Sequence, residues 1–184
     1  LSTGIAFSQQ PKFNRVLDEK TNGTGFVLSI VQDQKGFIWF TSGRKGLLRY
    51  DGKKLTAYSH NSDNPNSLAN NRAFAVAVDS TGDIWIGTLG FGLDRFDPET
   101  KKFTHFRHNS KDPASLCNDT ILTVTTDRSG DIWIGTNRGL DKLNPATGKF
   151  THYIIDELFS QAITSNDFIS INAICEDRKG NLWI

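Results

Sequence analysis

The chain has 184 residues, of which 37% are hydrophobic and 11% aromatic, and its 21 basic and 20 acidic residues leave a net charge of +1. This composition is typical of a globular chain rather than a disordered one. The charges of both signs are spread along the whole sequence, which argues against the basic surface that nucleic acid or an anionic membrane would require. Sixteen glycines predict many turns, and no stretch reaches the roughly 18 apolar residues of a membrane-spanning helix.

Residues 1–23 form an N-terminal segment that precedes the first recurring unit. Its triplet Ala6-Phe7-Ser8 ends a weakly apolar run in the small-x-small pattern of a secretory signal peptide. A frayed terminus would explain the same residues equally well. Both interpretations stay open at this point.

From residue 24 onward the chain repeats one motif, which reads Asp-x-x-Gly-x-Ile/Leu-Trp. The four tryptophans of the chain all belong to it and stand 46, 48 and 50 residues apart. The fixed residues of the four copies are Asp33, Gly36 and Trp39; Asp79, Gly82 and Trp85; Asp127, Gly130 and Trp133; and Asp177, Gly180 and Trp183. Four copies indicate a repeat protein with one structural unit per period.

Each unit contains four short segments with strand character, and the second unit shows them best. They are rich in β-branched and aromatic residues, are bounded by turn formers, and are expected over residues 73–78, 83–88, 92–96 and 102–106. Between the first two segments, Asp79 can accept backbone N–H groups and Gly82 can take a positive φ. Each unit is therefore predicted to be a four-stranded antiparallel meander.

The first segment of each unit is apolar on both faces, as in residues 27–31 and 121–125, so neighbouring sheets must cover it from both sides. One position within it always carries a small residue, which suits an innermost strand where sheets crowd towards an axis. The residues at that position are Ser29, Ala75, Thr123 and Ala173. These features and the period near 48 residues predict an all-β fold of β-propeller blades.

The predicted blades divide residues 24–184 into three complete units and the start of a fourth. They are expected at approximately 24–59, 72–107, 120–154 and, incomplete, 169–184. A propeller needs about four to eight blades to close its ring. The chain is therefore expected to be part of a larger propeller, with exposed apolar blade faces and a tendency to self-associate if it folds alone.

The unit resembles the two-component regulator propeller repeat, whose pattern is roughly D-x-x-G-x-[IL]-W-[IF]-G-T-x-x-G-L-x-[RK]-[YFL]-[DN]. Residues 79–97 and 127–144 follow that pattern almost residue for residue. The first copy departs from it, with Phe40-Thr41-Ser42-Gly43 in place of Ile-Gly-Thr. The resemblance implies a fragment of a propeller that in this family is usually seven-bladed.

The resemblance also implies a function, because such repeats are typical of the periplasmic sensor region of hybrid two-component histidine kinases. The segment would then lie on the periplasmic or cell-surface side of a membrane-anchored bacterial protein, detect an oligosaccharide or other small molecule, and transmit the signal to a kinase and phosphorelay. The kinase activity would belong to the parent protein and not to this segment. Expected partners are the ligand, the remaining blades of the parent chain and a second copy of the parent, with no nucleic acid and no cofactor.

The ligand site is expected on the face of the propeller where the longer connections leave, which include residues 59–72, 107–120 and 155–168. Variable loops on a rigid scaffold are where binding residues concentrate. Side chains there that offer aromatic surface or hydrogen-bond donors to a sugar or carboxylate are Arg44, Lys45, Arg72, Phe91, Asn137 and Arg138. Solvated loop residues with no ligand would give the same sequence pattern.

Two other functions stay open, namely a propeller enzyme such as a glycosidase or lyase, and a protein-interaction scaffold. A glycosidase would need two carboxylates that face each other. The acidic residues here stand at turns or, like Asp94 and Asp141, recur in successive units, which favours a structural place. The motif tryptophans are likewise expected to pack between blades rather than to stack on sugars.

The histidines and cysteines do not suggest a metal site. His105 and His152 occupy equivalent positions one unit apart, where a surface role is expected instead of metal binding. Cys117 and Cys175 fall at opposite ends of the first segment in successive units, beyond the reach of a disulfide. Both are predicted to be free thiols.

Overall fold

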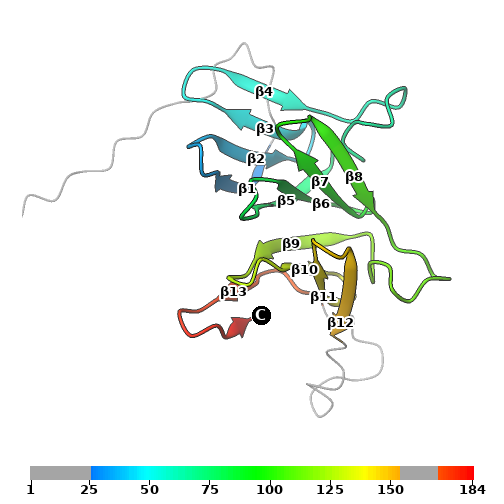
Figure 1. Ribbon diagram of the computed structural model, residues 1–184. Coiled ribbons are helices and arrows are strands. Elements are labelled where there is room, and N and C mark those ends of the chain that lie inside the picture. The colour runs from blue at the N-terminus through cyan, green and yellow to red at the C-terminus, as the bar shows by residue number, and fades with distance from the viewer. Residues whose placement is uncertain (1–25, 154–169) are drawn as a thin grey trace, which may run out of the picture.

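The computed structural model describes residues 26–153 and 170–184, and every regular element within them is a β-strand (Figure 1). The first sheet contains β1 (Val27–Gln32), β2 (Ile38–Ser42), β3 (Gly46–Tyr50) and β4 (Leu55–Tyr58). The second contains β5 (Ala73–Val78), β6 (Ile84–Thr88), β7 (Leu93–Asp97) and β8 (Lys102–Phe106). The third contains β9 (Ile121–Thr126), β10 (Ile132–Thr136), β11 (Gly139–Asn144) and β12 (Lys149–Tyr153), and β13 (Cys175–Glu176) pairs with β14 (Leu182–Trp183).

Each sheet is an antiparallel meander whose strands follow one another in sequence order, so each is a propeller blade. We number them blade 1 (β1 to β4), blade 2 (β5 to β8) and blade 3 (β9 to β12). The predicted fold class is therefore confirmed, with three four-stranded blades and a two-stranded sheet. Residues 1–23 and the connection 155–168 lie outside the described residues. No helix in the described ranges is long and apolar enough to span a membrane.

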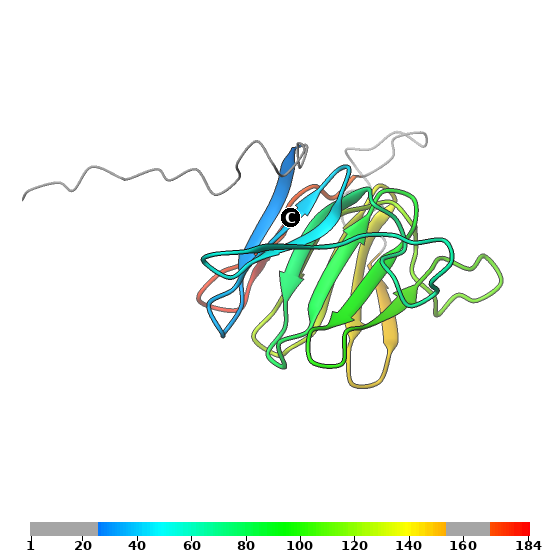
Figure 2. The ribbon, with the colours of Figure 1, turned by 90° about the horizontal axis from the view of Figure 1, so that it is seen from above.

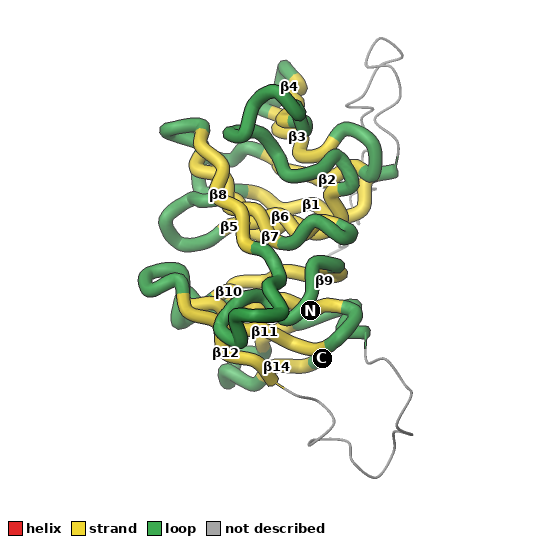
Figure 3. Tube along the Cα trace, turned by 90° about the vertical axis from the view of Figure 1, so that its right-hand side faces the viewer, coloured by secondary structure: helices red, strands yellow, loops and turns green. Residues whose placement is uncertain are grey.

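The blades stack with their first strands next to one another, as two views show (Figures 1 and 3). β1 packs against β5, and β5 packs against β9. Ser29 Oγ accepts a hydrogen bond from the Val76 N–H at 3.2 Å, and Thr126 Oγ1 donates to the Val78 carbonyl at 3.3 Å. The first strand of each blade is thus the innermost one, where the small side chains allow the sheets to approach.

Apolar side chains fill the interfaces between successive blades. Trp39 of blade 1 packs with Phe96 of blade 2, with ring centroids 5.9 Å apart. Trp85 of blade 2 belongs to a cluster with Ile121 and Ile132 of blade 3. Burial of such large side chains is the main force that holds the blades together, and it confirms the packing role expected for the tryptophans in the four-stranded blades.

The motif aspartate organises the turn between the first two strands of each unit. Asp79 Oδ1 accepts the backbone N–H groups of Thr81 at 2.9 Å and Asp83 at 3.0 Å, and its Oδ2 accepts the indole N–H of Trp85 at 2.8 Å. Gly82 closes the turn with a φ of +92°. Asp33, Asp127 and Asp177 make the corresponding bonds in their own units. One side chain therefore fixes both the hairpin and the tryptophan.

Two apolar surfaces are left uncovered at the two ends of the row of described blades. Phe26 and Ile30 at the outer face of β1 are 85% and 66% exposed, because no described element packs on that face. Trp183 is 66% exposed, because the β13–β14 sheet lacks the third and fourth strands that cover the tryptophan in a complete blade. These are the exposed blade faces that the sequence predicts.

Gly87 on β6 lies against Ile121 of blade 3, at the interface between blades 2 and 3. A Cβ at this position would lie 2.4 Å from Ile121 Cγ2 and 3.3 Å from Ala75 Cβ. Because a packed interior relaxes only in part, we expect Gly87→Ala to lower the free energy of unfolding by about 1–3 kcal/mol in urea titrations. Gly43→Ala is the control, since its Cβ would meet only Leu28 at 3.8 Å. Equal stability of the two variants would contradict this packing.

Candidate functional site

The propeller fragment has two unlike faces, because the connections of an antiparallel meander alternate from one end of the strands to the other. The turn face carries the tight turns after the first and third strands, such as residues 79–82 and 98–101. The loop face carries the hairpins after β2, β6 and β10 and the long connections 59–72 and 107–120. Figure 2 shows the connection from β8 to β9 projecting away from the sheets.

A buried aspartate of the following blade fastens each long connection. Asp94 on β7 is fully buried, and its Oδ2 accepts the Ala69 N–H at 2.6 Å. Its Oδ1 lies 2.7 Å from His105 Nδ1, and His105 Nε2 lies 3.2 Å from the Pro65 carbonyl. Because both ring nitrogens face acceptors, the imidazole must be doubly protonated to donate to both. The hydrogen bond to Asp94 raises the pKa of His105, although burial opposes it.

The same arrangement recurs one blade later. Asp141 accepts the Cys117 N–H at 2.7 Å and lies 2.7 Å from His152 Nδ1, while His152 Nε2 lies 2.8 Å from the Pro113 carbonyl. Burial lowers the pKa of His152, but the hydrogen bond and charge of Asp141 outweigh it and the net shift is upward. Both histidines lie at the surface, as expected, with side chains 29% exposed, and each also joins a long connection to a buried carboxylate.

The long connections are also tied to the blade before them. The Asn71 carbonyl accepts the Gly46 N–H at 3.1 Å, and the Asp119 carbonyl accepts those of Gly90 at 3.0 Å and Gly92 at 2.9 Å. Within the loops, His60 and His108 each approach the carbonyl of Leu68 or Leu116 at 2.8 Å through Nδ1. The connections are thus ordered parts of the scaffold, each bonded to both of the blades that it joins.

Two of the six predicted ligand residues lie in one row across the loop face. The Leu89 N–H donates to the Arg72 carbonyl at 3.1 Å, Leu89 bridges to Thr120, and the Asn137 N–H donates to the Thr120 carbonyl at 3.3 Å. This chain of backbone contacts links Arg72, which precedes β5, to Asn137, which follows β10. Asn137 Oδ1 is buried without a hydrogen-bond partner among the described residues.

The other predicted residues occupy separate hairpins. The backbone N–H groups of Arg44 and Lys45 both donate to Ser42 Oγ at 3.3 Å in blade 1, and that of Arg138 donates to Thr136 Oγ1 at 3.0 Å in blade 3. Phe91 in blade 2 is partly exposed, and the Arg107 guanidinium lies 5.7 Å from the centroid of its ring. The six residues therefore share a face without converging on one point.

Arg107 is the residue that sequence reasoning missed. It stands at the boundary between β8 and the long connection, where a strand residue and a loop residue look alike in sequence. The contact with Phe91 creates an aromatic and cationic pair in the centre of the described loop face. Cation–π pairs of this kind present flat apolar surface and N–H donors together.

The described residues offer little support for nucleophilic chemistry. Burial raises the pKa of the Cys117 thiol to about 12, and its Sγ lies 3.4 Å from Thr136 Oγ1. Both cysteines are free, as predicted. Asp94 and Asp141 are fully buried and bound to backbone and histidine, so they hold the structural places expected for them. Within residues 26–153 and 170–184, no three His, Cys, Asp or Glu side chains are grouped as metal ligands.

Comparison with known proteins identifies the repeat. Residues 67–90, 115–138 and 165–184 match the model of the two component regulator propeller family. Each of the three matches spans a motif turn with its tryptophan. No curated protein matches the chain.

Solved structures with the same fold include extracellular domains of hybrid two component systems from B. thetaiotaomicron. One is 32% identical, covers 86% of this chain and superposes with a TM-score of 0.71. A second is 21% identical over 84% of the chain, with a TM-score of 0.52. A virginiamycin B lyase from Staphylococcus aureus shares the fold at 15% identity, 85% coverage and a TM-score of 0.63. The chain spans only 22%, 24% and 47% of these three proteins respectively.

Proposed function

Because the chain is built from repeats of the two component regulator propeller family, we propose that it forms part of the extracytoplasmic ligand-sensing propeller of a hybrid two-component histidine kinase. Its ligand is an oligosaccharide bound on the loop face. The kinase and phosphorelay belong to the parent protein, which lies across a membrane. The observation that carries the proposal is the 32% identity to an extracellular domain of a hybrid two component system over 86% of the chain.

The construction of the loop face supports this role. The long connections are fastened to the following blade by buried carboxylates and to the preceding blade by backbone hydrogen bonds. A surface that is already ordered loses little conformational entropy when a ligand binds, and this favours ligand binding. Phe91 with Arg107, and Arg72 with Asn137, supply the stacking surface and hydrogen-bonding groups that sugar rings need.

We expect oligosaccharides to bind the chain and to lose affinity when the loop face is altered. An array of neutral, acidic and sulfated oligosaccharides identifies the ligand, and isothermal titration calorimetry measures its dissociation constant. Phe91→Ala and Arg72→Gln should each weaken binding about tenfold, the effect of losing one stacking contact or one charge-assisted hydrogen bond. Lys53→Gln on the turn face is the control and should leave the affinity unchanged.

Other outcomes would favour the alternatives. Cleavage of the oligosaccharide during the titration would indicate a propeller enzyme, and variants of single carboxylates should then abolish the turnover. Absence of any saccharide ligand, together with tight binding to a purified protein partner, would indicate an interaction scaffold. Equal loss of affinity in Lys53→Gln and in the loop-face variants would contradict the placement of the site.

A further inference from the structure

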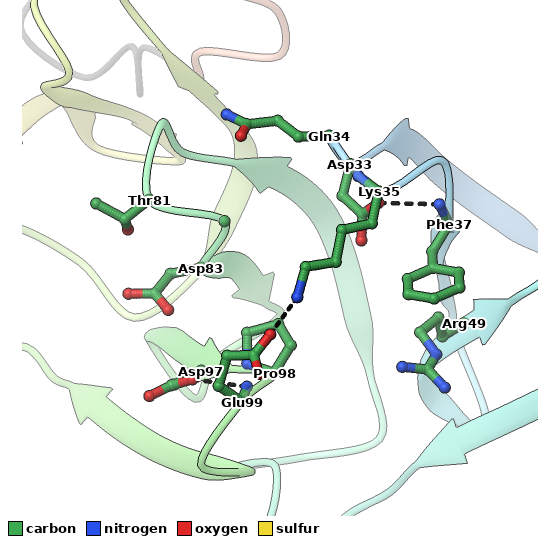
Figure 4. Close-up of a pocket in the computed structure, with 11 residues that line it drawn as sticks. Asp33, Gln34, Lys35, Phe37, Arg49, Thr81, Asp83, Asp97, Pro98 and Glu99 are labelled. Atoms are coloured by element: carbon green, nitrogen blue, oxygen red, sulfur yellow. Dashed lines mark hydrogen bonds and ion pairs between the residues drawn. The ribbon is translucent and has the colours of Figure 1, made fainter.

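A small cavity lies on the turn face between blades 1 and 2 (Figure 4). Its volume is about 140 Å³, which suits a single charged group and its neighbouring atoms better than a whole drug-sized ligand. Phe37 and Arg49 form the wall contributed by blade 1, and Asp83, Asp97 and Glu99 lie across from them on blade 2.

Arg49 belongs to a position that is basic in all three blades. The residue stands opposite the motif tryptophan on the third strand, and the three pairs are Trp39 with Arg49, Trp85 with Arg95, and Trp133 with Lys142. In each blade the cation lies over the tryptophan ring, at 5.7, 5.7 and 5.6 Å from its centroid. The three side chains therefore occupy equivalent places.

In blades 2 and 3 this cation has a carboxylate partner from the residue just before the second strand. Arg95 Nε donates to Asp83 Oδ2 at 2.6 Å, and a second guanidinium nitrogen contacts the same oxygen. Lys142 Nζ lies 3.1 Å from Asp131 Oδ2. The cavity between blades 2 and 3 is lined by Arg95 and Asp131, and both are already paired in this way.

Blade 1 lacks the carboxylate, because Phe37 stands where Asp83 and Asp131 stand in the other blades. The guanidinium of Arg49 instead lies 4.6 Å from the centroid of the Phe37 ring. No hydrogen bond or ion pair joins it to any residue of the described ranges, and its Nε is buried without a partner. A buried donor without an acceptor is unfavourable, so a ligand that supplied an acceptor to Arg49 would gain from it.

The acidic residues around the cavity do not fill that need, since each is engaged elsewhere. Glu99 pairs with Lys35, Asp83 pairs with Arg95, and Asp97 accepts hydrogen bonds from Thr100. Asp33 is held by its own turn and by the indole of Trp39. The cavity therefore lacks a hydrogen-bond acceptor for Arg49. The pair of Arg95 with Asp83 in blade 2 shows that a carboxylate suits an arginine at this position.

We propose that the cavity is a second ligand site, in which Arg49 binds the carboxylate of an acidic ligand that takes the role Asp83 has toward Arg95. A carboxylate accepts two parallel N–H bonds from a guanidinium, which gives the site directional preference over a neutral hydroxyl. The site lies on the face opposite the proposed oligosaccharide site, so the two proposals can be tested independently.

The test compares two sugars that differ only at one carbon. D-glucuronate and D-glucose are each titrated into the 184-residue chain while the side-chain Nε–H resonances of arginine are followed by nuclear magnetic resonance. We expect glucuronate to shift the Arg49 resonance in a saturable manner, and glucose at the same concentrations to leave it unmoved. Glucose 6-sulfate is the third probe and distinguishes a carboxylate site from a general anion site.

Two variants decide the assignment. Phe37→Asp gives Arg49 an internal carboxylate partner like that of Arg95 in blade 2, and should weaken glucuronate binding about tenfold. Arg49→Gln removes the guanidinium and should also weaken binding about tenfold, measured from the backbone amides of the turn face. Lys149→Gln on β12 changes the charge equally and should leave binding intact. An unchanged affinity in both cavity variants, an equal response to glucose, or a response to glucose 6-sulfate alone would overturn the proposal. Loop-face variants such as Phe91→Ala should not affect this titration.

Discussion

Trp85→Ala is expected to lower the free energy of unfolding by about 3–5 kcal/mol, the range for removing a large aromatic side chain from a packed interior. Trp85 is fully buried between blades 2 and 3, and its ring lies 5.7 Å from that of Phe106. The substitution also removes the indole N–H that Asp79 accepts, so the second oxygen of a buried carboxylate loses its partner. Urea unfolding of the chain, followed by intrinsic fluorescence and circular dichroism, measures the change.

The molecule supplies its own control for this result. Trp183 belongs to the same motif and donates to Asp177 at 3.3 Å, yet it is 66% exposed. Since little apolar area leaves water there, Trp183→Ala should change stability by less than about 1 kcal/mol. A similar loss in both variants would mean that the tryptophan acts through its turn rather than through packing between blades.

His105→Ala is the second substitution with a large expected effect. It leaves the Asp94 carboxylate fully buried with only the Ala69 N–H as a partner, and it releases the loop at Pro65. We expect a loss of about 2–3 kcal/mol near pH 6, because removing the partly exposed histidine leaves the buried Asp94 carboxylate without its charged partner. In blade 1 the residues at the positions of Asp94 and His105 are Leu48 and Ala57. A blade therefore forms without the Asp–His pair, and we infer that the pair stabilises the long connection.

The effect should depend on pH in a defined direction. The pKa of His105 is raised above the ordinary value of 6.5 by its hydrogen bond to Asp94, while burial and the charge of Arg107 oppose the shift. A raised pKa in the folded state adds stability that is complete below the unfolded value and is lost as the pH rises through the folded value. The difference between wild type and His105→Ala should therefore shrink from pH 6 towards pH 9. A constant difference in thermal unfolding across that range would contradict a protonated His105.

Much of the fold could be predicted from the sequence because the turns depend on local chemistry. The bonds of Asp79 to its own turn and to Trp85 span at most six residues, so the motif specifies them directly. The composition and periodicity of the strands predicted where they lie, and β8 begins and ends at the predicted residues Lys102 and Phe106. A repeat of about 48 residues then fixed the order of the blades.

The arrangement of the loop face could not be predicted in the same way, because it depends on contacts between residues far apart in sequence. Asp94 reaches back 25 residues to Ala69, and Arg107 meets Phe91 only once both hairpins are folded. The recurrence of Asp and His in two units did carry a signal, because the two residues stand opposite each other on neighbouring strands in both blades. Phe37 in place of Asp was also visible in the repeats, but its consequence for Arg49 required the register of β2 and β3.

The ties that hold each connection to the blade before it also bear on how the molecule folds. Asn71 and Asp119 bond to the hairpins of the preceding blades, and Asp94 and Asp141 bond to the same connections from the following ones. Structure of this kind couples nearest neighbours in a row, so that stability is a sum over units and the interfaces between them. Blade 2 has an interface on both sides within the described residues and blade 1 on only one. Blade 3 likewise packs on blade 2 and on the β13–β14 sheet. In the 184-residue chain, unfolding should therefore start at blade 1 and at the β13–β14 sheet and advance unit by unit towards blades 2 and 3.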